Sequence, residues 1–137
     1  MNWPQTSNIR VRKIVFIVVS FLLVIGVACA FWWKSSDSAL ISASGKGDIA
    51  TVKKLLGEGA NPNKNDKNST TSLISAAYGG HADVVKLLLD KGADPNAKFG
   101  NGETSLMLSE NQGYADVVKM LLDKGADLNA KKESDGA

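Results

Sequence analysis

The sequence is poor in the side chains that metal sites, disulfide frameworks and catalytic relays require. Its 137 residues include one cysteine, Cys29, and one histidine, His81. One cysteine excludes an internal disulfide framework, and one histidine cannot by itself form a histidine-based metal site or proton relay. A Gly-rich phosphate-binding loop is also missing from the sequence. We therefore expect that the protein is not an enzyme, and that it binds no metal, cofactor or small-molecule substrate.

Acidic residues are absent from the N-terminal segment, where Arg10, Arg12, Lys13 and Lys34 are the only charged residues before Ser35. The whole chain has 16 basic and 14 acidic residues, which gives a formal net charge of +2. The basic balance therefore comes from the N-terminal segment, and the remainder of the chain is mildly acidic. Because no basic patch is evident in that remainder, we expect no nucleic-acid binding.

The segment Ile14–Trp33 carries no charged residue over 20 positions. A helix of about 20 apolar residues spans the roughly 30 Å hydrocarbon layer of a bilayer. Basic residues precede the segment and aromatic residues end it, which places the N-terminus in the cytoplasm by the positive-inside rule. We predict a cytoplasmic segment at 1–13, a transmembrane helix (signal anchor) at 14–33, a linker at 34–37 and an exocytoplasmic domain at 38–137, which in a bacterium would lie in the periplasm.

Two alternatives to an uncleaved anchor stay open for this segment. The residues Ala28-Cys29-Ala30 fit the small-x-small rule for signal-peptide cleavage, although bulky Phe-Trp-Trp would follow the cut. Cys29 is also a candidate for lipidation, although Gly26 stands where lipoprotein signals usually carry a larger aliphatic residue.

The chain after Asp37 is internally repetitive with a period of 33 residues. The segment HADVVKLLLDKGADPN, which begins at His81, matches YADVVKMLLDKGADLN, which begins at Tyr114, at thirteen of sixteen positions. Self-similarity at a period of roughly 20 to 50 residues indicates a repeat architecture. We therefore predict three repeats, at approximately 38–70, 71–103 and 104–137.

Each repeat reads as two short helices separated by a glycine and followed by a polar turn. Apolar residues recur at helical spacing in the second block, for example Val85, Leu88 and Leu89. A helix of about ten residues is too short to be stable alone, so it must pack against its neighbours. We expect Gly80 and its counterparts to separate the two helices, and Gly92 and its counterparts to end the second one in a left-handed conformation.

The 33-residue period, Gly80-His81, the Val-Val-Lys-x-Leu-Leu run and the Gly-Ala-Asp-x-Asn-Ala segment occur together, and this combination resembles the ankyrin repeat family. The resemblance covers essentially all of residues 37–137. It implies an all-α solenoid of three helix-turn-helix units with β-hairpin-like fingers, here behind one N-terminal transmembrane helix. Thr71-Ser72-Leu73-Ile74 lacks the family's usual Pro and His. Ser69 stands where the family usually has Gly, so we expect a first finger shaped differently from the second.

The resemblance implies that another protein binds a concave surface formed by the first helices and the fingers. The corresponding variable positions are Lys64, Lys67, Asn68 and Thr70 on the first finger, Lys98, Phe99, Asn101 and Glu103 on the second, and Tyr78 and Asn111 at the ends of two first helices. Tyr78 and Phe99 are the principal candidates, because aromatic side chains carry much of the energy at interfaces. Phe99 replaces the family's usual Asp, and either packing against the neighbouring finger or contact with a partner would account for it.

The two ends of the predicted stack differ in polarity. In the first repeat, Thr51 and Lys54 occupy positions that are apolar in the later repeats, and a polar outer face is what a terminal repeat needs. The last repeat keeps Val117 and Met120 at these positions. We expect them to leave an apolar end face, which either the tail Asn129–Ala137 covers or which serves in docking or self-association.

Structural roles are also expected for the remaining titratable residues. His81 has Asp48 and Tyr114 as its counterparts in the other repeats, so we interpret it as a turn residue. Asp and Lys residues three positions apart on the second helices indicate charge pairs within a helix rather than acid/base catalysts. These pairs are Asp83 with Lys86 and Asp116 with Lys119, and Asp90 with Lys91 and Asp123 with Lys124 are expected as neighbouring pairs.

The sequence thus predicts a membrane-anchored ankyrin-repeat protein that mediates protein–protein interaction, as a scaffold or adaptor, on the exocytoplasmic side. Cleavage near Ala30 would instead give a soluble, exported effector or inhibitor in the periplasm or outside the cell. The predicted partners are another protein of unknown identity and, through Ile14–Trp33, the lipid bilayer.

Overall fold

The computed structural model describes residues 17–18 and 36–130 of the chain. The chain divides into two compact units, Met1–Lys34 and Ser35–Ala137. In the second unit a helical segment at 36–46 is followed by five further helices. Their bounds are α2 Ile49–Gly57, α3 Ser72–Gly79, α4 Ala82–Asp90, α5 Ser105–Gln112 and α6 Ala115–Asp123. This unit is all-α, as predicted.

The first unit is described only at Ile17 and Val18, which are helical and 65% and 50% exposed. The rest of the predicted transmembrane helix, the segment 1–13 and Cys29 lie outside the described residues. Over residues 17–18 and 36–130, no helix has both the length and the apolar character that crossing a bilayer needs. The membrane-spanning helix therefore stays a prediction.

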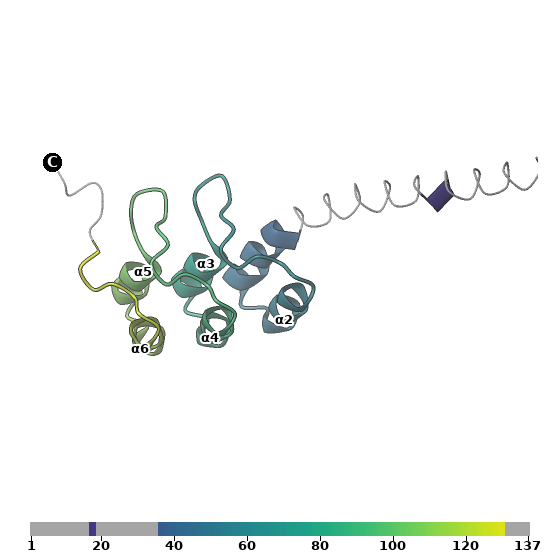
Figure 1. Ribbon diagram of the computed structural model, residues 1–137. Coiled ribbons are helices and arrows are strands. Elements are labelled where there is room, and N and C mark those ends of the chain that lie inside the picture. The colour runs from purple at the N-terminus through teal and green to yellow at the C-terminus, as the bar shows by residue number, and fades with distance from the viewer. Residues whose placement is uncertain (1–16, 19–35, 131–137) are drawn as a thin grey trace, which may run out of the picture. The chain divides into compact units, whose positions relative to one another are not determined.

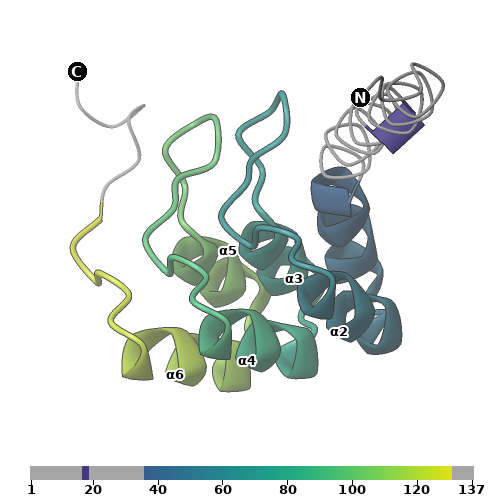
Figure 2. The ribbon, with the colours of Figure 1, turned by 45° about the vertical axis from the view of Figure 1, so that its right-hand side comes forward.

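The helices of the second unit form two rows (Figures 1 and 2). The helical segment 36–46, α3 and α5 make the first row, and α2, α4 and α6 make the second. Within each repeat the two helices pack together, as α3 does with α4 and α5 with α6, and each row is held by contacts between neighbours. Two narrow loops project from the same side of the stack, and these are the fingers (Figure 2).

The ends of the short helices are fixed by particular residues. Thr71 and Thr104 cap α3 and α5, because each Oγ1 accepts a hydrogen bond from a backbone N–H three residues later, at 3.3 and 3.4 Å. Gly80 follows α3 at a φ of 71°, a left-handed conformation that glycine adopts without a Cβ clash. Gly92 takes the same conformation after α4, with a φ of 88°. Both glycine predictions are confirmed.

Asp48 caps α2 with a carboxylate instead of a hydroxyl. Thr51 donates to this carboxylate twice, from its hydroxyl at 2.6 Å and from its backbone N–H at 3.2 Å. These hydrogen bonds, the one from the hydroxyl above all, hold the pKa of Asp48 below its ordinary value. His81 and Tyr114 begin α4 and α6 at the equivalent positions without a side-chain cap.

The core is linear and runs along the stack between the two rows. Leu40, Val52, Val85, Leu88 and Leu121 are each fully buried, and they come from all three repeats. Burying such a side chain stabilises the fold by roughly 1.5–3 kcal/mol. Since α2 to α6 are each only eight or nine residues long, nearly all of this stabilisation depends on contact with the neighbouring helices.

The two fingers have the same backbone form, which corrects the expectation that Ser69 would make them differ. Isolated bridges join Asn65 to Thr71 in the first finger and Lys98 to Thr104 in the second. Ser69 has a φ of 61° and is the one non-glycine residue with positive φ in the described part of the chain. Gly102 stands at the equivalent position with a φ of 81°. The serine thus adopts the glycine conformation at an energetic cost instead of changing the finger.

The linker predicted at 34–37 extends too far into the repeat domain. Ser36 and Asp37 are helical, and they are only 8% and 4% exposed. Asp37 accepts a hydrogen bond from the backbone N–H of Asn61 at 2.9 Å. Both residues therefore belong to the first repeat. The short Lys-Ser-Ser-Asp sequence gave no sign of this burial, because its residue types are those of a surface linker.

The expected apolar end face is present, but Val117 and Met120 do not form it. Val117 is 1% exposed, and Met120 is partly buried against the core. Both face the preceding repeat, which is also why Thr51 and Lys54 could be polar in a repeat that has no predecessor. The tail Asn129–Ala137 is described only as far as Ala130, so its predicted packing lies outside the described residues.

Candidate protein-interaction surface

The candidate binding residues on the fingers lie mostly at the surface. Lys64, Lys67, Asn68, Lys98 and Asn101 are exposed. Thr70, Phe99 and Glu103 are partly buried, close to the finger bases. The two fingers approach each other closely, since a Cβ added at Gly100 would lie 3.2 Å from the Asn68 backbone oxygen. Eight of the ten predicted residues therefore share one continuous double-finger surface.

Tyr78 and Asn111, the other two predicted residues, lie on the first row of helices and not on the fingers. Both are exposed, and Tyr78 is 60% exposed, which is unusual for a large aromatic side chain. They occupy equivalent positions near the ends of α3 and α5, two helices that pack side by side. At 1.5 Å per residue, Tyr78 is roughly 10 Å along α3 from the finger base at Thr71. A partner would have to span that distance to contact both groups of residues.

Phe99 replaces an aspartate that has a structural task in the first finger. There, Asp66 accepts hydrogen bonds from the backbone N–H groups of Asn68 and Thr70, at 2.8 and 2.9 Å. In the second finger, Asn101 does this work instead, by accepting from Glu103 N–H at 3.1 Å. The Phe99 backbone still bonds Glu103 and Gly102, at 2.7 Å each, but its ring has no hydrogen-bonding role in the turn and is partly buried and partly open to solvent.

A ladder of asparagine side chains joins successive repeats, and sequence reasoning did not foresee it. Asn63 Oδ1 accepts from the backbone N–H of Asp94 at 2.7 Å, and its Nδ2 donates to the Gly92 oxygen at 3.0 Å. Asn96 repeats both contacts with the next unit, at 2.7 and 3.1 Å. The repeated Gly-Ala-Asp-x-Asn segment carries the signal, since its last residue is the bridging one.

A ring of each later repeat lies against a glycine of the repeat before it. A Cβ added at Gly47 would lie 2.5 Å from the His81 ring, and one added at Gly80 would lie 2.6 Å from the Tyr114 ring. His81 Nε2 is also 3.0 Å from the Gly45 oxygen. His81 therefore has a structural role at the junction between repeats, which refines the predicted turn role.

A charge pair within residues 36–130 joins two repeats. Lys124 Nζ lies 3.3 Å from Asp90 Oδ1, and the two groups come from the ends of α6 and α4. This differs from the predicted pairs within a helix. Both side chains are about half exposed, at 51% and 49%, so the pair contributes at most about 1 kcal/mol.

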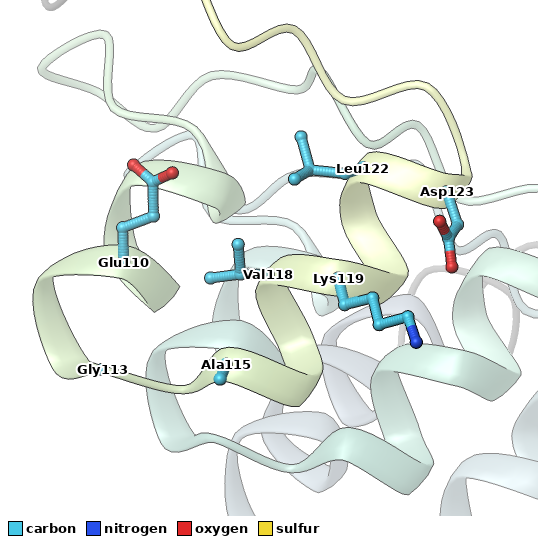
Figure 3. Close-up of a pocket in the computed structure, with 7 residues that line it drawn as sticks. All are labelled: Glu110, Gly113, Ala115, Val118, Lys119, Leu122 and Asp123. Carbon is cyan, nitrogen blue, oxygen red and sulfur yellow. The ribbon is translucent and has the colours of Figure 1, made fainter.

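Two open hollows lie on the described surface. One, of about 420 Å³, lies at the C-terminal end of the stack, where Val118 and Leu122 on α6 face Glu110 on α5 (Figure 3). The other, of about 370 Å³, lies between α4 and α6 beside Asp90 and Met120. In residues 17–18 and 36–130, no three His, Cys, Asp or Glu side chains are grouped as metal ligands would be.

These features agree with the comparison against protein families. A family model described as ankyrin repeats (3 copies) matches residues 40–132. The chain belongs to the ankyrin-repeat family. A search of curated proteins found no match to the sequence. Ankyrin repeats are interaction modules that generally bind other proteins, so the family membership supports protein–protein interaction as the general function of residues 40–132.

Proposed function

We propose that this ankyrin-repeat protein binds another protein through a surface made by its two fingers and the exposed ends of α3 and α5. The observation that carries the proposal is Tyr78, which is 60% exposed on the row of helices next to the fingers. A large aromatic ring in water gains free energy when a partner covers it, and such rings are enriched among the residues that dominate binding. Phe99, partly exposed on the second finger, is the second aromatic anchor.

The polar candidates supply specificity around these anchors. Lys64, Lys67 and Lys98 give the fingers three basic side chains, which favour a partner with acidic groups opposite them. Asn68 and Asn111 offer amide groups that both donate and accept hydrogen bonds, whereas the Asn101 amide already bonds Glu103 and presents the turn of the second finger. Thr70 and Glu103 complete the set near the finger bases.

We further propose that the repeats act on the exocytoplasmic side of a membrane, held there by Ile14–Trp33. The support is the uncharged run of 20 residues and the basic residues that precede it. The protein would then serve as an anchored scaffold or adaptor for a neighbouring membrane or periplasmic protein. The sequence Ala28-Cys29-Ala30 favours a second candidate, in which cleavage releases the repeats as a soluble effector or inhibitor.

The binding surface is tested by photo-crosslinking in the native cells. A photoreactive aromatic residue at position 99 should capture one partner, and adding Tyr78→Ala to this chain should reduce that capture at least tenfold. The matched control is Lys86→Ala with Lys119→Ala, two exposed changes on the second row of helices. Capture that survives Tyr78→Ala unchanged, with the helical circular dichroism intact, would contradict the proposed surface.

The membrane proposal is tested separately by extraction and mass. A chain that begins at Met1, leaves the membrane fraction only with detergent and is digested by protease added outside the cytoplasmic membrane agrees with an anchored exocytoplasmic domain. A soluble chain whose intact mass corresponds to an N-terminus near Phe31 would establish the cleaved form instead.

A further inference from the structure

The C-terminal end of the repeat stack has the contact groups of a junction, and residues 36–130 contain no further repeat that completes this junction. We define the end face as Glu110, Gly113, Val118, Leu122, Asp123 and Asn129. Three kinds of contact hold the junction between the second and third repeats, and the end face carries one half of each. None of this depends on the finger surface proposed above.

The first open contact is the one between a glycine and the aromatic or histidine ring of the following repeat. At the preceding repeat, the Tyr114 ring lies against Gly80 so closely that an added Cβ would be 2.6 Å from it. Gly113 is the equivalent glycine one repeat later, with a similar φ of 77°. Apart from its chain neighbours, no described residue has an atom within 4 Å of a Cβ added there. The space that the Tyr114 ring fills beside Gly80 is therefore open beside Gly113 in the described part of the protein.

The second open contact concerns the polar groups. Asp90 binds Lys124 of the next repeat at 3.3 Å, and Asp123 is the equivalent carboxylate of the last repeat. Asn96 binds two backbone groups of the next repeat, and Asn129 is its equivalent. Neither Asp123 nor the Asn129 side chain has such a partner across the end face within residues 36–130.

The third open contact is apolar. Val85 and Leu89, covered by the third repeat, are 0% and 7% exposed. Their equivalents are more exposed: Val118 is only partly buried, and Leu122 is 36% exposed. Both lie on α6 and line the hollow of about 420 Å³ (Figure 3). Glu110 faces them from α5 and adds an acidic group to the rim.

We propose that the end face docks a helical hairpin of another protein, which continues the stack by presenting an aromatic or imidazole ring to Gly113 and a lysine or arginine to Asp123. The two occupied junctions define this chemistry. His81 and Tyr114 supply the ring, and a basic residue follows each of them ten positions later, as Lys91 and Lys124. The hollow is lined by two acidic side chains, Glu110 and Asp123, and one basic side chain, Lys119, and this acidic excess favours a basic hairpin.

A second copy of this chain fits the end face poorly. Its first repeat carries Asp48 in place of the ring and Glu58 in place of the lysine, so stacking it there would bring Glu58 towards Asp123. The Asn61 N–H that a ladder asparagine would need is already bound to Asp37, at 2.9 Å. Like charges and an occupied donor both oppose such a contact. Head-to-tail stacking of two copies is therefore disfavoured, and we assign the end face to a hairpin of a different chain.

The chemistry of the end face is tested with a tethered probe of known sequence. The full chain is extended by a flexible Gly/Ser linker and a second copy of residues 104–130, which carries the ring and the lysine of the native junction. The control extension carries Asp and Glu at the two positions equivalent to Tyr114 and Lys124. We expect the matched probe to raise the thermal midpoint by at least about 5 °C and the control to leave it unchanged.

The host variant Gly113→Ala should remove most of that rise, since its Cβ would stand where the ring lies. No rise with the matched probe, or the same rise with both probes, overturns the proposal.

Two further measurements decide who occupies the face in the natural protein. A photoreactive residue at position 122 should capture, in native cells, a peptide that contains an aromatic or histidine residue and, ten positions later, a lysine or arginine. Adducts on residues 131–137 would identify the chain's own tail as the occupant, and a dimer abolished by Leu122→Asp would identify a second copy. Either of these results, or no adduct at all, overturns the proposal, whereas capture from position 99 bears only on the finger surface.

Discussion

The two ends of the repeat stack are closed to different degrees. At the N-terminal end, the buried Asp37 accepts from the Asn61 backbone, in the place that an asparagine of the preceding repeat takes at the internal junctions. At the C-terminal end, Asn129 has no such contact among the described residues, and the space beside Gly113 is open. Each repeat thus carries contact groups for the next repeat, such as the asparagine side chain and the glycine that receives a ring. These groups stabilise the fold only where a neighbouring repeat supplies their partners.

The largest expected difference concerns the leucines at equivalent places of α4 and α6. Leu89→Ala should cost about 3 kcal/mol of unfolding free energy, because it removes a side chain that is 7% exposed and leaves a cavity. Leu122→Ala should cost less than about 1 kcal/mol, because that side chain is 36% exposed at the open end. Urea unfolding of both variants gives the two values, and equal losses would mean that the end face is covered.

The next comparison concerns the two glycines that receive a ring. Gly80→Ala should cost about 2–3 kcal/mol, because the new Cβ meets the Tyr114 ring and also strains the positive φ. Gly113→Ala should cost about 1 kcal/mol, since only the backbone strain applies there.

The control for this pair is Tyr114→Ala, which removes the ring from the junction. In that background, Gly80→Ala and Gly113→Ala should have similar effects on the thermal midpoint. A Gly80 cost that persists without the ring would show that the backbone, and not the ring, determines the requirement for glycine.

A third comparison concerns the polar groups that end the ladder. Asp37→Ala should lower the unfolding free energy by about 2 kcal/mol, because it leaves the Asn61 N–H without its charged acceptor. Asp37→Asn should restore most of the loss, since asparagine does the same work at Asn63 and Asn96. Asn129→Ala should change stability by no more than about 0.5 kcal/mol. A large effect at Asn129 would reveal a partner for it and contradict the open end.

Much of the fold could be predicted because the period and the glycines are local signals. The 33-residue spacing, the apolar positions of α4 and α6 and the left-handed Gly80 and Gly92 all follow from short stretches of sequence. The sequence was a poorer guide to which face of each helix points towards which neighbour. Val117 and Met120 were assigned to the wrong face because periodicity identifies an apolar stripe but not the neighbour that covers it.

The contacts between repeats were the least predictable part. Asn63 and Asn96 sit in a polar turn, where asparagine is common for local reasons, so their bridging contacts leave no separate trace in composition. Asp37 was placed in a linker for the same reason. The candidate binding positions were found by resemblance, and their exposure agrees with that assignment for the finger lysines and Tyr78, while Phe99 is half-buried.

The smallest expected effect concerns the starts of α3 and α5, the first helices of the second and third repeats. Ser72 and Ser105 are the first residues of α3 and α5, where proline is well tolerated because the backbone N–H has no partner within the helix. The preceding Thr71 has a ψ of 166°, which is compatible with a following proline. The buried Ser72 hydroxyl has no partner among the described residues, whereas Ser105 donates to the Pro95 oxygen at 3.5 Å.

Ser72→Pro should therefore raise the unfolding free energy by about 1 kcal/mol, since it removes an unsatisfied buried hydroxyl and restricts the unfolded chain. Ser105→Pro should gain less than half of that, because it also loses a hydrogen bond. Thermal midpoints of the two variants, measured together, give the difference. If Ser105→Pro stabilised the protein more than Ser72→Pro, the hydroxyl at position 72 would have to be satisfied in solution, and the α3 start would not be the weaker of the two.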